Sequence, residues 1–287
     1  MPQTLFAHLN VDDPNVAWEV ALGRYRSVGD PGADDAAGFL SHFFVSRIRA
    51  AAAGKAKMLE REFTLDAVRA KRDPILVSRL RGVYLFQSKD DAHWAVDNWG
   101  LGWRHENIAP IEFHAEQLTA ADSDWITHDL FSPDTEWMSR YWSGELRSPN
   151  PRIEVLGIGY GKIHDRPIRE RAYEIVVKHW PKSVALFQHA AFAVAYAGVH
   201  TAAQTRMMMQ IAGERLVFEP IIYMADFENP TSSTLAAWKE AREAGDLPPV
   251  PQDAEIAVPD LSSRRLEVDI GRMEDLLIAA GFSVPHL

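Results

Sequence analysis

Three short segments hold the side chains of this sequence that are best suited to chemistry. They are TLFAHL (4–9), RGVYLFQSKDDAHW (81–94) and RIEVLGIGYGKI (152–163), which offer a histidine, aromatic rings and a glutamate. An aromatic ring attracts a planar cation through stacking and cation–π forces. A carboxylate held in place stabilises positive charge on a reacting sugar, as in glycosidases. The chemistry on offer is therefore the binding of a planar cation and the stabilisation of positive charge.

Several other kinds of catalytic site are disfavoured by the sequence. It contains no GxxxxGK[ST], GxGxxG, HExxH or GxSxG motif and no EF-hand loop, which argues against a P-loop enzyme, a Rossmann dehydrogenase and a zincin. The absence of cysteine excludes disulfides, thiolate nucleophiles and thiolate zinc sites. The eleven histidines form no His/carboxylate set with ligand spacing, so no metal site is predicted.

The segment 81–94 resembles the second motif of ADP-ribosyltransferase-like proteins. That motif is a G-[ILV]-Y-[FL] strand followed by a small polar residue and a helix, and this sequence has Gly-Val-Tyr-Leu, then Ser88, then a helical pattern. The resemblance implies that Tyr84 and Trp94 sandwich the nicotinamide ring of NAD and that Ser88 hydrogen-bonds nearby. It implies NAD as the bound cofactor.

The other two segments are similar to the first and third motifs of the same family. TLFAHL looks like its N-terminal strand, in which an aromatic residue, here Phe6, is followed by a basic one, here His8, that binds the nicotinamide ribose or the phosphates. The third motif places a glutamate near the start of a later strand, where it stabilises oxocarbenium character. Glu154 is the first candidate for this catalytic residue, Glu145 the second and Glu112 the third.

The resemblance implies an NAD-dependent ADP-ribosyltransferase of glycosyltransferase type. Such an enzyme cleaves the nicotinamide–ribose bond and transfers ADP-ribose to a protein or nucleic-acid acceptor, with a role as a toxin or phage-defence effector. The alternative is a non-catalytic binding protein that retains the fold. A metal-dependent hydrolase using Asp90/Asp91 or Asp34/Asp35 is disfavoured, because adjacent side chains point in different directions.

Each motif also has a plain structural explanation. Tyr84 with its apolar neighbours could be ordinary core, His8 could be a core histidine with a hydrogen-bond partner, and a glutamate that opens a strand is usually just exposed. Only the order of the three segments within the first 160 residues favours their joint interpretation as a site.

Charge is unevenly distributed along the chain, whose formal net charge is −10. Residues 226–287 contain 12 acidic and 5 basic residues, which suggests a partner protein at the acidic C-terminal part. Residues 47–81 contain 10 basic and 4 acidic residues. This basic stretch could face the phosphates of a cofactor or nucleic acid, and the plainer interpretation is a solvated helix face.

Composition predicts a globular protein of the cytosol, with no membrane partner. With 47% apolar and 24% charged residues, the 287-residue chain can bury a large core. The longest uncharged run, 183–205, contains polar side chains and many alanines, which argues against insertion into a bilayer. The N-terminal residues turn polar too soon for a secretory signal peptide.

Pattern along the chain predicts an α+β fold, with an ADP-ribosyltransferase-like split β-sheet core and a mainly helical C-terminal half. We expect an α+β region over 1–164, a helical region over 165–228, and a Pro-rich acidic segment with a terminal helix over 229–287. Strands are expected at 4–9, 81–88, 108–113 and 152–163. In the first half, helices are expected at 14–25, within 34–62 and at 89–99. In the second half, one helix is expected to begin at 168, a second to run from 181 to 198, a third to continue to about 213, and a last one to lie at 269–280.

Overall fold

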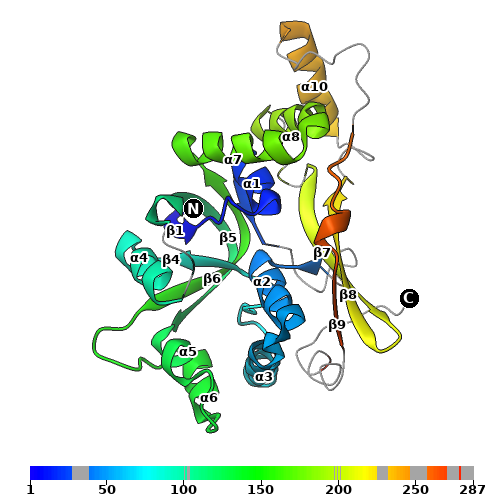
Figure 1. Cartoon of the computed structure of the whole chain (residues 1–287). Coiled ribbons are helices and arrows are strands. Elements are labelled where there is room, and N and C mark those ends of the chain that lie inside the picture. Colours follow the sequence, from blue (N-terminus) through cyan, green and yellow to red (C-terminus); the bar gives the residue numbers. More distant parts are fainter. Residues whose placement is uncertain are drawn as a thin grey trace.

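The structure is a computed structural model of the whole chain. It describes residues 1–27, 39–99, 101, 104–196, 198, 200, 202–224, 232–245, 257–269 and 278. Two antiparallel sheets form the α+β fold, with helices at both ends of the first sheet and the second sheet beside it (Figure 1).

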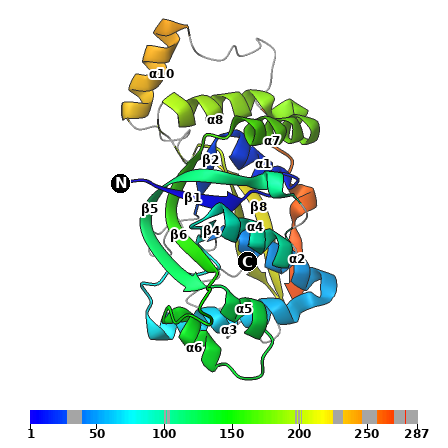
Figure 2. The ribbon, with the colours of Figure 1, turned by 90° about the vertical axis from the view of Figure 1, so that its left-hand side faces the viewer.

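The first sheet contains the three segments that carry the motifs. Its strands are β1 (Gln3–His8), β2 (Arg24–Arg26), β4 (Val83–Phe86), β5 (Ile108–Asp122) and β6 (Ile153–Ile163). They lie in the order β2-β6-β4-β1-β5, and β5 also pairs with β6. The pairs β1–β4, β4–β6, β6–β5 and β5–β1 therefore form a closed circuit of four strands. Figure 2 shows how far the long strands β5 and β6 curve to close it.

Closure requires β5 and β6 to bend, and a glycine lies at the bend. The register between them shifts between Ala115 and Gln117, which marks a bulge. Gly159 lies opposite this bulge with φ +138°, and a Cβ atom on it would lie 2.2 Å from the backbone oxygen of His114. Only glycine fits this close approach of two strands.

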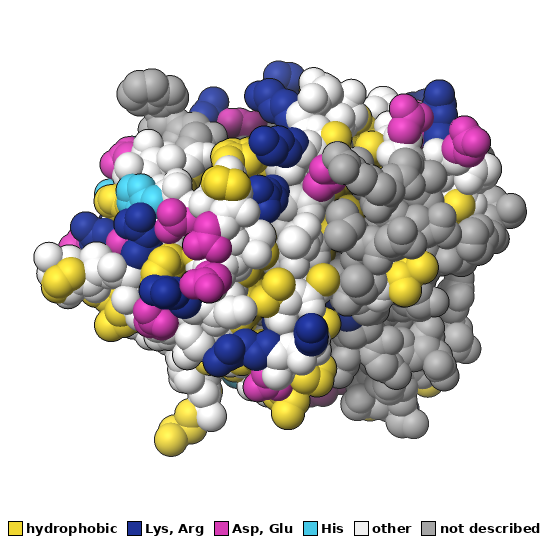
Figure 3. Space-filling view, turned by 90° about the horizontal axis from the view of Figure 1, so that it is seen from below, with side chains coloured by type: hydrophobic (Ala, Val, Ile, Leu, Met, Phe, Trp, Pro, Cys, Tyr) yellow, Lys and Arg dark blue, Asp and Glu magenta, His cyan; other side chains and the backbone are white. Residues whose placement is uncertain are grey.

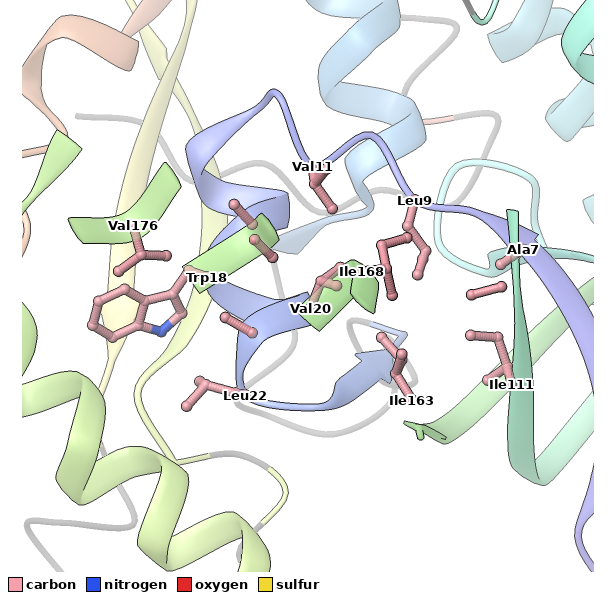
Figure 4. Packing of buried hydrophobic residues seen from close by; sticks show 14 of the residues in the cluster. Ala7, Leu9, Val11, Trp18, Val20, Leu22, Ile111, Ile163, Ile168 and Val176 are labelled. Atoms are coloured by element: carbon pink, nitrogen blue, oxygen red, sulfur yellow. The ribbon is translucent and has the colours of Figure 1, made fainter. Parts of the chain in front are cut away.

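One face of the sheet is covered by α1 (Pro14–Ala21), α7 (Arg166–His179) and α8 (Val184–Tyr196). Figure 4 shows side chains of this core, with Val20 and Ile168 between the helices and Ala7 and Ile111 on the strands. Trp18 is fully buried at its centre and contacts the rings of Trp180 and Phe187 edge-on at 6.0 and 5.3 Å. Each large side chain buried here contributes roughly 1.5–3 kcal/mol.

The opposite face is covered by α3 (Ala56–Arg72), α4 (Lys89–Asn98), α5 (Asp124–Asp129) and α6 (Glu136–Trp142). Side chains of β4 alternate between the two faces. Val83 and Leu85 belong to the first core, Tyr84 packs against the cluster under α3 and α6, and Phe86 packs under α4. The face that carries Tyr84 is therefore the one that positions the candidate site.

The helix α2 (His42–Ala50) begins with Ser41, whose hydroxyl accepts a hydrogen bond from the backbone N–H of Phe44 at 3.2 Å. A π-helical segment (Ala51–Lys55) connects α2 to α3. Gly54 in it has φ +85°, which breaks the helical path and lets α3 run in a new direction. The stretch 42–72 thus forms two helices rather than one.

The second sheet has strands β3 (Phe39–Leu40), β7 (Gln204–Ala212), β8 (Arg215–Tyr223) and β9 (Leu266–Asp269), in that order. Buried polar contacts attach it to the first sheet. The Thr205 hydroxyl donates to the Glu19 carboxylate at 2.8 Å, and Arg24 pairs with Glu19 while donating to the carbonyl of Ala203 at 3.0 Å. A further helix among the described residues of the C-terminal part is α10 (Ser232–Ala244).

Most of the elements expected in the first half are confirmed, with different bounds. The expected strand 108–113 continues to Asp122 as β5, and the expected helix 14–25 ends at Ala21 because Gly23 turns the chain at φ +79° into β2. The prediction of a helix that runs to about residue 213 is wrong, since residues 204–212 form the strand β7. Its alternating buried and half-buried side chains are those of a strand.

The second half was expected to be mainly helical, and it also contains most of the second sheet, because β7, β8 and β9 lie in it beside α7, α8 and α10. The expected Pro-rich segment 229–287 contains α10 and β9. The expected helix 269–280 lies outside the described residues, apart from its two positions Asp269 and Ile278. No helix in the described ranges has both the length and the apolar character needed to cross a bilayer.

We predict that Gly159→Ala destabilises the chain by about 3 kcal/mol or more, because the new Cβ meets the backbone oxygen of His114. Gly144→Ala is the matched control. Gly144 also has positive φ, +74°, but a Cβ atom on it would have no other atom within 4 Å. Gly144→Ala should therefore lose only the roughly 1–2 kcal/mol that a left-handed backbone costs a residue with a Cβ atom. Chemical denaturation measures both, and equal losses would contradict the role given to Gly159.

Candidate functional site

A buried arginine lies between two buried glutamates on the sheet face under α3 and α6. Arg79 Nε donates to Glu62 Oε2 at 3.1 Å, and its Nη1 donates to Glu154 Oε1 at 2.6 Å. Glu62 comes from α3, Arg79 from the turn before β4, and Glu154 from β6. The three residues are 1%, 3% and 0% exposed. Their charges are thus matched with one another rather than with solvent.

Aromatic side chains complete this group. The Tyr141 hydroxyl donates to Glu154 Oε1 at 2.8 Å. The guanidinium carbon of Arg79 lies 5.0 Å from the ring centre of Tyr84 and 5.3 Å from that of Phe43, and these two rings contact each other at 4.3 Å. We call this group the Arg79 centre; it consists of Phe43, Glu62, Arg79, Tyr84, Tyr141 and Glu154.

Burial and the neighbouring charges set the protonation states in the Arg79 centre. Burial raises the pKa of Glu154, and the opposing effect of Arg79 only partly offsets it. For Arg79 burial acts against the charge, but Glu154 and Glu62 hold its pKa well above the usual value. Burial also raises the pKa values of Tyr84 and Tyr141, so both phenols stay neutral.

Two polar atoms of the Arg79 centre have no hydrogen-bond partner among the described residues. They are Glu154 Oε2 and the hydroxyl oxygen of Tyr84, and both are buried. An unsatisfied buried polar atom costs about 1–3 kcal/mol. A polar atom of a water or ligand within hydrogen-bond distance would satisfy each of them.

Tyr84 and Glu154, two of the residues singled out in the sequence, are brought together here. Their strands β4 and β6 are neighbours, and β1 with His8 is the next strand on the other side of β4. Phe6 pairs with Phe86, and Phe86 pairs with Glu154. Paired residues point to the same face, and so do residues two apart on one strand. The side chains of His8, Tyr84 and Glu154 therefore share one face of the sheet.

His8 is outside the Arg79 centre, at the end of the sheet covered by α4. Its Nε2 is buried and has no partner among the described residues. Burial lowers the pKa of His8, and the nearby His105 lowers it further. The imidazole is therefore held neutral.

Ser88 and Trp94, the other two residues assigned to NAD, lie at the start of α4 and within it. Ser88 is the N-cap, and its hydroxyl accepts from the Asp91 backbone N–H at 3.0 Å and donates to the Asp91 carboxylate at 2.7 Å. The ring of Trp94 lies 6.3 Å from that of Trp99 and 5.5 Å from the guanidinium carbon of Arg152. Both side chains are therefore used in local contacts.

The second and third candidates for the catalytic glutamate are on the surface. Glu145 follows α6, and its side chain is about half exposed and 3.6 Å from Arg140. Glu112 on β5 contacts His114 and His164 at 3.0 Å each, and hydrogen bonds from these two histidines lower its pKa. Neither glutamate belongs to the Arg79 centre.

The arrangement does not fit a nicotinamide ring held between Tyr84 and Trp94. Each of the two rings packs against its own partners, Tyr84 against Phe43 and Arg79, and Trp94 against Trp99 and Arg152. Glu154 has no exposed surface through which it could touch a sugar. In this conformation the predicted NAD site is occupied by the side chains of the protein itself.

Several arginines of the basic stretch 47–81 are paired with carboxylates. Arg47 lies 3.8 Å from Glu62, Arg69 lies 2.8 Å from Asp66, and Arg49 pairs with Asp13. Seen from below, Lys and Arg side chains are interspersed with acidic and apolar ones rather than forming one continuous basic face (Figure 3). These paired arginines therefore have structural roles.

The described residues also do not favour a metal site. Asp90 and Asp91 lie in the first turn of α4, where carboxylates interact favourably with the helix dipole. Asp34 and Asp35 lie outside the described residues. Within the described part of the chain, no three His, Asp or Glu side chains are grouped so that they could hold a metal ion.

Sequence reasoning missed Arg79, Glu62 and Tyr141 as partners of Glu154. Arg79 is 75 residues away from Glu154 along the chain, and Tyr141 is 62 residues away from Arg79. No local motif connects them. The available signal was an arginine within an otherwise apolar stretch, Ile75-Leu-Val-Ser-Arg-Leu, directly before the tyrosine strand.

We predict that Arg79→Met destabilises the chain by about 3–5 kcal/mol, because it leaves buried Glu154 without a counter-charge and Glu62 with only the more distant Arg47. Arg72→Met is the matched control, since Arg72 is an exposed arginine at the end of α3, where such changes stay within about 0.5 kcal/mol. Urea denaturation measures both variants, and a loss under 1 kcal/mol for Arg79→Met would contradict the role of the Arg79 centre.

Glu154 should also make stability depend on pH. The pKa of Glu154 is raised in the folded chain. The stability that its protonated carboxyl contributes is therefore fully present below the pKa of an unfolded glutamate, about 4.3, and is lost as pH rises through the pKa of Glu154 in the folded chain. Glu154→Gln removes this titration and keeps an oxygen for Tyr141. The stability of the unsubstituted chain relative to Glu154→Gln should therefore fall as pH rises.

Denaturation of both proteins at a series of pH values measures this difference. Glu116→Gln is the control for the loss of one carboxyl, because Glu116 is an exposed glutamate on β5. A difference that does not change with pH for Glu154→Gln, or that changes equally for Glu116→Gln, would contradict the prediction.

The chain matches no protein-family model, no curated protein and no solved structure.

Proposed function

We propose that this protein is a non-catalytic binding protein that retains an ADP-ribosyltransferase-like arrangement of strands. The observation that carries the proposal is the state of Glu154, which is fully buried and hydrogen-bonded to Arg79 and Tyr141. A carboxylate that stabilises an oxocarbenium ion must face the reacting sugar with its charge available. The charge of Glu154 is already matched by Arg79.

The energetics of the Arg79 centre support the proposal. Removing one partner from a buried ion pair costs about 3–5 kcal/mol. Moving Arg79 aside to expose Glu154 incurs a comparable cost unless a ligand offsets it. An opening that costs about 3–5 kcal/mol leaves roughly one molecule in a hundred to one in several thousand open, since each 1.4 kcal/mol is a factor of ten.

A second candidate function is NAD-dependent ADP-ribosyl transfer to a protein or nucleic acid. It is favoured by a separate observation, the side-by-side position of the strands that carry His8, Tyr84 and Glu154, with all three side chains on one face. An ADP-ribosyltransferase site would need these three side chains close together, and the sequence alone did not show that the three strands are neighbours. The candidate also requires NAD binding to displace Arg79 from Glu154.

Incubation of the purified protein with millimolar NAD, with free nicotinamide followed by chromatography, separates the two functions. We expect no nicotinamide above the level of a protein-free control. We also expect no rise in melting temperature with NAD, because a ligand stabilises a protein only if it binds the native state.

Variants make the contrary outcome informative. Release of nicotinamide by the unsubstituted protein that is lost in Glu154→Gln but kept in the surface control Glu112→Gln would replace the binding proposal with the transferase. A thermal shift with NAD in the absence of release would contradict the closed state of the site. Circular dichroism of Glu154→Gln confirms that loss of activity is not loss of fold.

A further inference from the structure

Three histidines lie together where α4 packs on the end of β1. His8 is the last residue of β1, His93 lies in the middle of α4, and His105 begins the short 3-10 helix η2 (His105–Asn107). The rings of His93 and His105 contact each other, with their centres 4.7 Å apart. His105 also acts on the charge of His8, which places these two near each other. We call the three residues the histidine cluster.

Each histidine of the cluster has one buried ring nitrogen without a hydrogen-bond partner among the described residues. The three atoms are His8 Nε2, His93 Nε2 and His105 Nδ1. A charged imidazolium carries a hydrogen on both of its ring nitrogens. Protonation of any of the three would therefore leave a buried N–H donor without an acceptor. Two charged rings in contact, such as those of His93 and His105, would also repel each other.

The acidic side chains near the histidine cluster favour protonation only weakly. Asp97 accepts a hydrogen bond from His105 Nε2 at 2.9 Å, but the side chain of Asp97 is 61% exposed, so water screens its charge. Glu106 raises the pKa of His8, and this effect is smaller than the lowering by burial and by His105. His8 therefore stays neutral while α4 is packed on the sheet.

The basic side chains beside η2 act against protonation. Arg171, from α7, donates to the backbone oxygen of Glu106 at 2.8 Å and to Asn107 Oδ1 at 3.0 Å. Arg171 pairs with no carboxylate in the described part of the chain, so its charge adds to that of any protonated histidine. Arg104 is paired with Asp12 at 3.1 Å. The surroundings of the histidine cluster thus offer little compensation for an added proton.

The helix α4 packs on the sheet through a small apolar cluster of its own. It contributes only Ala92, Ala95 and Val96 to the buried part of this cluster, opposite Phe86 and Ile108 of the strands. Figure 1 shows α4 on the outside of the first sheet. A segment with few buried apolar contacts opens locally at a lower cost than the whole fold. Release of α4 is therefore an event that the histidine cluster can control.

We propose that the histidine cluster is a pH-sensitive switch that keeps α4 packed on the sheet at neutral pH and releases it in acid. The inference goes beyond the proposed function, because no residue of the Arg79 centre takes part. Its sign follows from proton binding. His8 is neutral in the closed chain, whereas in the open chain its ring is in water and takes up a proton below about pH 6.5. The open form binds more protons, so lower pH favours it.

The test is amide hydrogen exchange of the full chain, followed by mass spectrometry, with rates corrected for the chemical effect of pH on exchange. A histidine that is protonated only in the open form raises the open fraction about tenfold between about pH 7.5 and about pH 5.5. We therefore expect peptides from α4 to lose at least about tenfold in protection over this range, while peptides from α8 keep theirs. Equal protection of α4 at both pH values, or an equal loss in α8, would overturn the proposal.

Two variants assign the effect to the cluster. His8→Gln and His93→Gln each keep a polar side chain that does not titrate, and each should reduce the pH-dependent loss of protection in α4 by about threefold to tenfold. His179→Gln is the matched control, because His179 is an exposed histidine at the end of α7, and it should leave the loss unchanged. The measured quantity is the ratio of protection at the two pH values, so a variant in which α4 is looser at both still tests the switch. The full ratio in both cluster variants, or an equal reduction in His179→Gln, would overturn the proposal.

Discussion

The ion pairs of Arg79 with Glu62 and Glu154 are the constraint around which the first half of the molecule is arranged. One guanidinium connects α3, the turn before β4 and the start of β6, which are distant along the chain. Because none of the three residues is more than 3% exposed, each needs the other two in place. The side chains that satisfy these charges also fix α3 against the sheet.

This arrangement explains why the same residues cannot simply be assigned to catalysis. A glutamate that anchors the fold has its charge matched and its surface covered, whereas a catalytic glutamate needs an accessible charge. Tyr84 shows the same conflict, since its ring contacts Phe43 and Arg79. A strand whose sequence resembles a family motif can therefore be explained by packing alone.

The sequence predicts best where the signal is local. The strands at β1, β4 and β6 were predicted from short runs of apolar, β-branched and aromatic residues, and the helix α4 from the pattern that follows β4; their positions are confirmed. The strands β7 and β8 were missed because a run such as Met207-Met-Met-Gln210 fits either a helix or a strand until its partner is known. Of the candidate site, Tyr84 and Glu154 could be found by pattern, but Arg79 could not, since its role depends on residues brought together only by folding.

The closed circuit of β1, β4, β6 and β5 has a consequence for how the chain folds. β1 is synthesised first, yet its partners lie at residues 86 and 108–113, and the circuit closes only when 153–163 are present. The strand must therefore wait, unpaired, while about a third of the chain is made, and the circuit stays open for longer. Contacts of such sequence separation are slow to form and leave apolar strands exposed to other chains. We expect this protein to depend more on chaperones during synthesis than a protein of equal length built from sequential hairpins.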